Sequence, residues 1–168
     1  MRSTHKLPPG TEIQGKLDLV LGVADIPTDP APDWKPAGLQ AKAAAGADFV
    51  QTQFYMDVEV VKRYTSRLRE NGVRLPVLIG IAPIPSAKSA RWMREKLFGT
   101  RIPDAIVERL EKAQDAKAEG LKICVELLQQ LAEIPGVGGA HVMAPMNFSA
   151  IPLAIERSGV IRKQRKTA

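Results

Sequence analysis

The sequence is poor in the residues on which thiol, imidazole and metal chemistry depend. It contains one cysteine and two histidines among 168 residues. A single cysteine excludes an internal disulfide, and Cys124 falls on the apolar side of an expected helix, so we interpret it as a core residue rather than a nucleophile. Neither His5 nor His141 has a zinc-ligand spacing or a serine or cysteine partner for nucleophilic catalysis. No metal site is therefore expected, and redox chemistry would depend on an organic cofactor.

Long apolar runs are also missing. No stretch approaches the roughly 18–20 consecutive apolar residues that a membrane span requires. The first residues, Met1 to Lys6, are not followed by the apolar core of a signal peptide. These absences predict a cytoplasmic protein without a membrane partner.

The net charge of +6 gives little support to nucleic-acid binding. Six of the positive charges lie near the two ends of the chain, at Arg2, Lys6, Arg162, Lys163, Arg165 and Lys166. A nucleic-acid surface needs basic groups on a structured face, so we expect solvated ends and no nucleic-acid partner. The expected organisation is a connector over residues 1–16, a folded domain over 17–160 and a basic tail over 161–168.

Between the ends, short apolar runs alternate with amphipathic segments. Strands are expected over 17–24, 49–55, 75–81 and 140–143. Helices are expected over 37–45, 57–70, from 86, from Pro103 in the first turn, over 116–132 and over 149–157, with a turn at 135–139. Four βα units in a row predict an α/β fold with a parallel sheet covered by helices.

The number of βα units predicts a partial TIM barrel. A closed (β/α) barrel needs eight units and about 250 residues, so this chain supplies about four units of one. Alone, such a half barrel exposes two strand edges and the inner face of its sheet. We therefore expect a partner half barrel, a homo-oligomer that rebuilds the ring, or an open sheet.

Functional residues of parallel βα folds lie after the carboxyl ends of strands, here at 24–29, 53–57, 82–86 and 144–147. The glycines at 136, 138 and 139 precede a strand, so they form no dinucleotide fingerprint, and no phosphate-loop lysine motif is present. Gln53, beside Phe54 and Tyr55, offers an amide donor and acceptor and a stacking face for a fused heterocycle. The alternative, that Gln53 satisfies only backbone groups at the strand end, stays open.

Several segments, in unbroken order, resemble one enzyme family. Residues 45–57 read AGADFVQTQFYMD, residues 76–84 read PVLIGIAPI, and residues 101–103 read RIP. Together with the long helix and last strand over 119–141, they are similar to the methylenetetrahydrofolate reductases, and the likeness extends from about residue 17 to 159.

The resemblance implies a (β/α)8 barrel that binds FAD and reduces 5,10-methylenetetrahydrofolate to 5-methyltetrahydrofolate with electrons from NAD(P)H, in one-carbon and methionine metabolism. Gln53 matches a folate-contacting glutamine, with Phe54 beside it as a further candidate for the substrate. Lys42 matches a lysine near the flavin phosphates, and Met93 falls where a folate-stacking aromatic often occurs. In a cofactor enzyme of this kind the protein orients pterin and flavin against each other.

The sequence also departs from the family pattern. Ile26 and Asp29 lie in the segment that replaces a flavin-holding tyrosine and histidine, so they become candidate cofactor contacts. Asn147 stands near a position where relatives have an arginine for folate. The catalytic acid of the family belongs to the four N-terminal βα units, so no catalytic residue is assigned within this chain.

Three functions follow as hypotheses. The first is a methylenetetrahydrofolate reductase-like flavoprotein, or its C-terminal half, whose partner is an N-terminal half barrel. The second is a non-catalytic assembly or binding subunit that uses the open sheet face as an interface. The third is a tetrahydrofolate-dependent methyl-transfer or demethylation protein without flavin.

Overall fold

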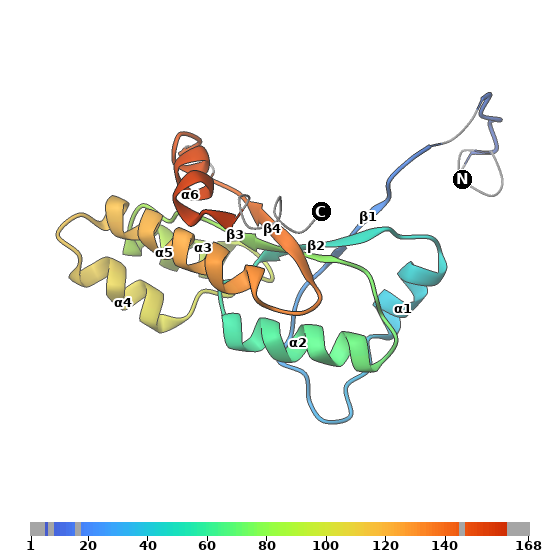
Figure 1. Cartoon of the computed structure of the whole chain (residues 1–168), viewed down its shortest axis with the longest axis horizontal. Helices are drawn as coiled ribbons and strands as arrows, with labels where there is room; N and C mark the ends of the chain where they lie inside the picture. Colours follow the sequence, from blue (N-terminus) through green and yellow to red (C-terminus); the bar gives the residue numbers. More distant parts are fainter. Residues whose placement is uncertain (1–5, 7–8, 16–17, 145–146, 161–168) are drawn as a thin grey trace.

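The computed structural model describes residues 6, 9–15, 18–144 and 147–160. Its sheet has four parallel strands in the order β1-β2-β3-β4. The strands are β1 (Gly22–Asp25), β2 (Phe49–Phe54), β3 (Val77–Ile81) and β4 (Val137–Val142). The helices are α1 (Ala37–Ala44), α2 (Val58–Glu70), α3 (Ala87–Lys96), α4 (Asp104–Lys112), α5 (Ala116–Ala132) and α6 (Ala150–Ser158). This alternation confirms the predicted α/β fold and partial barrel (Figure 1).

Local signals in the sequence explain where the helices begin and end. Asp57 and Asp115 precede α2 and α5, and their carboxylates accept hydrogen bonds from backbone N–H groups of the first turn. Gly46 follows α1 with φ +94°, a conformation that glycine adopts at little cost. The long helix over 116–132 is confirmed, whereas Pro103 lies at the N-cap of α4 instead of in its first turn.

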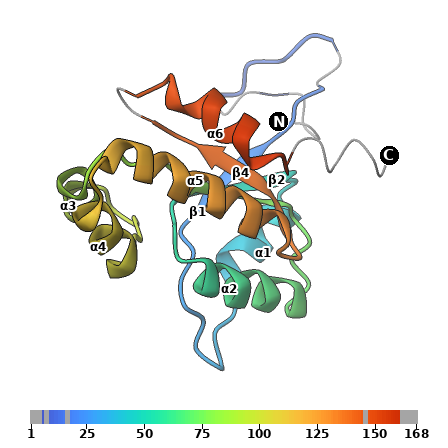
Figure 2. The same ribbon diagram turned by 60° about the vertical axis from the view of Figure 1, so that its left-hand side comes forward.

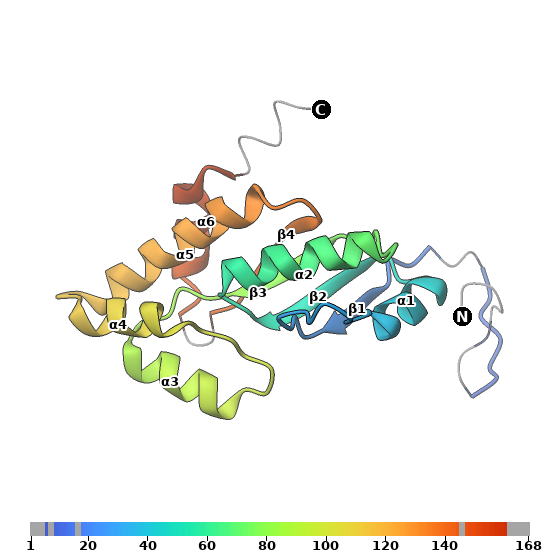
Figure 3. The same cartoon turned by 90° about the horizontal axis from the view of Figure 1, so that it is seen from below.

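One face of the sheet forms the hydrophobic core. Val50, Ile79 and Ile81 have no exposed surface, and they pack in one cluster with residues of α2 and α5 such as Val61 and Cys124. The helices α2 and α5 contact each other and lie along this face (Figures 2 and 3). We call it the outer face, because helices cover the outside of a (β/α) barrel.

The opposite, inner face is open over β1 and β2. Ala24 and Gln51 are exposed there, and Leu78 and His141 on β3 and β4 are half-buried. Successive strand residues point to opposite faces, so Gln51 lies between the buried Val50 and Thr52. The sheet thus has a buried outer face and an inner face that is partly exposed to solvent.

The first strand is shorter than predicted. A strand was expected from residue 17, but β1 begins at Gly22, where pairing with Phe49 of β2 starts. Leu19 and Val20, which precede it, are 45% and 76% exposed. Apolar composition alone does not make a strand here, because β1 is an edge strand and these residues lie beyond the start of its neighbour.

The last strand is longer than predicted. The expected turn over 135–139 is wrong in its second half, because β4 already begins at Val137. An added Cβ at Gly138 would lie 2.6 Å from the Cβ of Pro76, so glycine here permits close approach to the segment before β3. The predicted basic tail over 161–168 lies outside the described residues. Within the described part of the chain, no helix is long and apolar enough to cross a membrane.

Candidate functional site

The carboxyl end of β2 is held in place by β3. The hydroxyl of Thr52 accepts a hydrogen bond from the Gly80 N–H at 2.9 Å, and the Tyr55 N–H donates to the Gly80 carbonyl at 2.7 Å. Between these bonds the pairing of β2 with β3 shifts by a bulge, and an added Cβ at Gly80 would lie 2.5 Å from the Gln53 carbonyl oxygen. The bulge, and the absence of a side chain at Gly80, therefore determine the position of the Gln53 backbone.

Gln53 lines a cavity of about 570 Å³ on the inner face, which we call the inner cavity. Its lining comes from the ends of β1, β2 and β4, from α1 and from the segment after α3: Ala24, Asp25, Ile26, Lys42, Gln51, Thr52, Gln53, Phe98, His141 and Met143. The volume lies within the roughly 300–1,000 Å³ typical of small-molecule sites. The structure thus brings together Gln53, Lys42 and Ile26, three of the residues that the sequence predicted for the site.

Two of these side chains already make contacts that position them. The Lys42 ammonium donates to the Ala24 carbonyl at 2.6 Å, at the carboxyl end of β1. The Gln53 side-chain carbonyl accepts from the Phe54 N–H at 3.0 Å. This second contact is the backbone role that the sequence left open for Gln53. Its amide nitrogen has no hydrogen-bond partner within the described residues, so it remains available to a ligand.

His141 adds a polar group that the sequence reasoning did not assign to the site. It pairs with Gly80 across β3 and β4, and its Nδ1 is buried without a hydrogen-bond partner among the described residues. A buried polar atom without a partner costs free energy unless a ligand or water satisfies it. An imidazole can donate or accept at Nδ1, so it suits a polar ligand edge.

A second cavity of about 380 Å³ also lies at the carboxyl ends of the strands. We call it the apolar slot, and its lining comes from the ends of β2, β3 and β4 and from α3: Phe54, Ala82, Pro83, Ile84, Pro85, Lys88, Ser89, Trp92, Met93, Leu97, Ala144 and Asn147. It brings together Phe54, Met93 and Asn147, the remaining candidates for the substrate. Gln53 and Phe54 are consecutive residues of β2 yet line different cavities.

Asp29, predicted as a cofactor contact, has a different environment. Its carboxylate accepts two hydrogen bonds from the Arg63 guanidinium, each at 2.7 Å, and it is not among the residues that line either cavity. The hydrogen bond from Arg63 lowers the pKa of Asp29. Ile26 does line the inner cavity, and the backbone at Gly99, with φ +78°, packs closely against it.

Asp25 is a further residue that the sequence reasoning missed. It ends β1, lines the inner cavity and accepts a hydrogen bond from the Tyr64 hydroxyl of α2. Burial, and then this hydrogen bond, raise the pKa of Tyr64. The sequence carried a signal for Asp25, because it is the acidic residue at the end of an apolar strand. It also carried one for Gln51, which lies two residues before Gln53 on the same face of β2.

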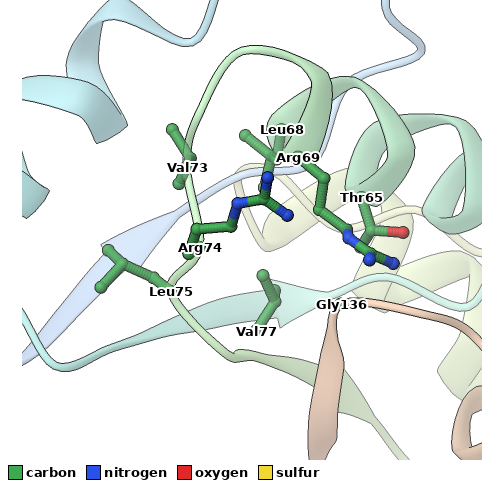
Figure 4. Close-up of a pocket in the computed structure, with 8 residues that line it drawn as sticks. All are labelled: Thr65, Leu68, Arg69, Val73, Arg74, Leu75, Val77 and Gly136. Carbon is green, nitrogen blue, oxygen red and sulfur yellow. The ribbon is translucent and has the colours of Figure 1, made fainter.

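A third cavity lies at the other end of the strands (Figure 4). It measures about 270 Å³ and is lined by Thr65, Leu68, Arg69, Val73, Arg74, Leu75, Val77 and Gly136. These residues lie in the second half of α2, in the segment that leads into β3 and at its first residue, and just before β4. None of the predicted site residues is among them. The amino ends of barrel strands usually serve stability instead of binding, so we place the candidate site at the carboxyl ends.

Comparison with known proteins agrees with this placement. The family model for methylenetetrahydrofolate reductase matches residues 23–159, which include all the residues that line both cavities. The chain belongs to the methylenetetrahydrofolate reductase family. Within the described residues, no cluster of three or more histidine, cysteine or acidic side chains could hold a metal ion.

Individual members of the family are much longer than this chain. A methylenetetrahydrofolate reductase of Schizosaccharomyces pombe is 28% identical over 152 residues, which cover 86% of this chain and 25% of that protein. A probable NADPH-dependent member from Caenorhabditis elegans is 31% identical and covers 76% of this chain and 23% of its own length. The Escherichia coli enzyme is 28% identical over 107 residues, 36% of its length. The chain thus corresponds to a part of these relatives.

A solved structure supports the fold. An uncharacterized protein from Clostridium thermocellum, described as binding two copies of 5-methyl-5,6,7,8-tetrahydrofolic acid, superimposes with a TM-score of 0.61. The alignment covers 87% of this chain and 54% of that one at 20% identity. At this identity the likeness concerns the arrangement of strands and helices.

Proposed function

We propose that this chain forms the folate-binding side of a methylenetetrahydrofolate reductase-type oxidoreductase that reduces 5,10-methylenetetrahydrofolate to 5-methyltetrahydrofolate. The convergence of Gln53, Lys42 and His141 on one cavity at the carboxyl ends of the strands carries the proposal. Family membership and the folate ligand of the Clostridium thermocellum neighbour support it. In the cell this reaction belongs to one-carbon metabolism and methionine synthesis, in the cytoplasm.

Gln53 is the proposed pterin contact. The pterin ring carries an edge of alternating donors and acceptors, which an amide side chain can match. The Gln53 amide nitrogen has no hydrogen-bond partner among the described residues, and the bulge that Gly80 permits holds the side chain at the cavity. Buried polar groups of a site reject ligands that leave them unpaired, so this amide would select a heterocycle with an acceptor at the matching position.

FAD is the proposed cofactor, and NAD(P)H the electron donor. The residues present fit one wall of a flavin site, because the inner cavity offers a cation at Lys42 and, at His141, a buried imidazole nitrogen without a partner in the described part of the chain. Lys42 would meet a phosphate, and His141 Nδ1 a polar edge of the ring system. When bound, a flavin would supply hydride-transfer chemistry between NAD(P)H and the folate.

A partner half barrel is part of the proposal. Within the described residues β1 and β4 each pair with one neighbouring strand, and the inner face beside Gln51 is open. A second half barrel, or a second copy of this chain, would cover this face and both edges. It would also supply the proton donor that the family keeps in its N-terminal units. The open face equally favours the second candidate, a non-catalytic assembly subunit.

The binding of 5-methyltetrahydrofolate to the chain, measured by calorimetry, tests the proposal. Gln53→Ala should weaken binding by roughly 1–3 kcal/mol, because the ligand loses its amide partner. Gln130→Ala is the matched control, since Gln130 is exposed on α5 and lines neither cavity. Equal affinities of the parent chain, Gln53→Ala and Gln130→Ala would mean that Gln53 has only a structural role.

A second measurement separates the reductase from its alternatives. Mixing the chain with an N-terminal half barrel of a relative and FAD should give a yellow complex that holds flavin through gel filtration. Flavin-free complexes that bind folate would support methyl transfer without flavin. A stable assembly that binds neither ligand would support the non-catalytic subunit.

A further inference from the structure

The third cavity, at the amino ends of the strands, contains two arginines. Arg69 lies in the last turn of α2 and Arg74 in the segment before β3, and in Figure 4 both side chains extend into the space between these elements. Both also line a further cavity of about 410 Å³, beside Ile134 and Pro135. Two positive charges from separate parts of the chain therefore lie at one concave surface.

Neither arginine has an ion-pair partner within the described residues. The other basic side chains of α2 each have one, and the pairs are Lys62–Glu59, Arg63–Asp29 and Arg67–Glu70. Glu70 lines the further cavity, but its carboxylate already pairs with Arg67 at 3.2 Å and accepts a hydrogen bond from Ser66 at 3.0 Å. Like charges at one concave surface repel each other unless an anion lies between them. The arrangement thus favours an anion from outside the described chain.

The surroundings of the two arginines suit a bound ligand. An added Cβ at Gly136 would lie 3.3 Å from the Cδ of Arg69, so the stem of this arginine packs against the glycine just before β4. Most of the remaining lining is apolar and buried, with Leu68 2%, Val73 3% and Val77 1% exposed. Apolar surroundings lower the local dielectric constant and strengthen the attraction between a cation and an anion. The cavity therefore combines a positioned cation with a surface for an apolar group.

We propose that the third cavity binds a small phosphate monoester, whose phosphate group Arg69 and Arg74 hold. A guanidinium group pairs with phosphate oxygens in a bidentate geometry. A phosphate carries about −1.5 to −2 charges at pH 7, which matches two arginines, whereas a carboxylate matches one. The apolar lining at Val73 and Val77 receives the organic group of the ester. The site is at the opposite end of the strands from Gln53, so the inference is independent of the proposed function.

Calorimetry with phenyl phosphate tests this site, in buffers matched in ionic strength with chloride. Arg69→Gln and Arg74→Gln should each weaken its binding roughly tenfold, the ratio that 1.4 kcal/mol produces. Arg157→Gln is the matched control. Arg157 is exposed in the last turn of α6, has no ion pair within the described residues and lines neither the third cavity nor the further one. Its replacement should leave binding within about twofold.

Two related probes separate the parts of the ligand. Inorganic phosphate should bind more weakly than phenyl phosphate, because it has no apolar group to bury. Benzoate keeps the ring but carries one charge, so it should bind at least about tenfold more weakly than phenyl phosphate. Equal binding of inorganic phosphate would assign the cavity to free phosphate and overturn the ester. Equal binding of benzoate would overturn the preference for phosphate.

Thermal unfolding provides a second measurement. A ligand that binds only the folded chain raises the Tm, so phenyl phosphate should raise that of the parent and of Arg157→Gln more than that of the two cavity variants. Any stabilisation through exclusion of the salt from the protein surface is common to all four proteins. Absence of phenyl phosphate binding, or equal affinities of the parent, Arg69→Gln and Arg74→Gln, overturns the proposal.

The outcome is separable from that of the proposed function. Gln53→Ala should leave phenyl phosphate binding unchanged, because Gln53 does not line the third cavity. A chain that binds 5-methyltetrahydrofolate through Gln53 but does not bind phenyl phosphate refutes only the phosphate site. Arginine-dependent binding of phenyl phosphate without folate binding supports the phosphate site and counts against the proposed function.

Discussion

The two faces of the central sheet differ although they share the same strands. Val50 on the outer face of β2 has no exposed surface, whereas its neighbour Gln51 on the inner face is exposed. On β3, Ile79 is fully buried under the helices and Leu78 is half-buried. Side chains one position apart therefore serve stability on one face and, in our proposal, binding and assembly on the other.

The difference shows where this fold obtains its stability. Burying a Val, Leu or Ile side chain contributes roughly 1.5–3 kcal/mol, and the outer face holds many of them against α2 and α5. The inner face contributes less in the single chain because it still contacts solvent. A partner that covers it would add apolar burial without any change in the outer core.

Truncation of a buried side chain on the outer face should have the largest effect on the free energy of unfolding. Ile79→Ala removes a fully buried side chain and should lower the free energy of unfolding by about 2–5 kcal/mol. Gln51→Ala, on the inner face, should change it by less than about 0.5 kcal/mol. Urea denaturation followed by circular dichroism measures both values. Similar losses for the two variants would mean that the inner face is already packed.

A methyl group added at Gly80, next to the end of β2, should have an intermediate effect on stability. Gly80→Ala places a Cβ about 2.5 Å from the Gln53 carbonyl oxygen, so the end of β2 must move. We expect a destabilisation of roughly 1–3 kcal/mol and weaker folate binding, measured by denaturation and calorimetry.

Gly38→Ala is the control for the glycine substitution. An added Cβ at Gly38 of α1 meets nothing within 4 Å, so alanine should stabilise the helix by roughly 0.5–1 kcal/mol. A destabilisation by Gly38→Ala, or none by Gly80→Ala, would contradict the described strand ends.

The pH dependence of stability should show a further effect of the outer core. Burial raises the pKa of the Cys124 thiol from 9.0 to about 12, so the thiol stays protonated in the fold after it ionises in the unfolded chain. Its contribution is present below pH 9 and is lost as the pH rises toward 12. The slope is at most about 1.4 kcal/mol per pH unit.

Cys124→Ala isolates this contribution. The free energy of unfolding of the parent should fall more steeply with pH above 9 than that of the variant. Parallel curves for the two proteins would show that the thiol ionises equally in both states and is not buried as described.

Much of the fold could be predicted from the sequence because local signals and the core agree. The helix expected over 116–132 has the same bounds as α5, where the carboxylate of Asp115 caps the first turn. The prediction was wrong at β1 and β4, the two edge strands. At an edge, pairing depends on where the neighbouring strand starts, and at β4 the glycines that suggested a turn instead permit close packing against Pro76.

The candidate site was predictable only in part. Gln53 and Lys42 could be identified because they lie in a recognisable segment and on its flanking helix. His141 could not, since its role depends on the pairing of β4 with Gly80. Asp25 had a signal as the acidic residue at the end of an apolar strand, but its contact with Tyr64 of α2 required the structure.

Hydrogen–deuterium exchange with and without 5-methyltetrahydrofolate tests most directly whether the carboxyl ends of the strands are the folate site. We predict slower exchange at the ends of β2 and β3, around Gln53 and Ala82, and no change around Arg69 and Arg74 at the other end (Figure 4). Protection confined to the Arg69 and Arg74 end, or no protection at saturating ligand, would contradict the account.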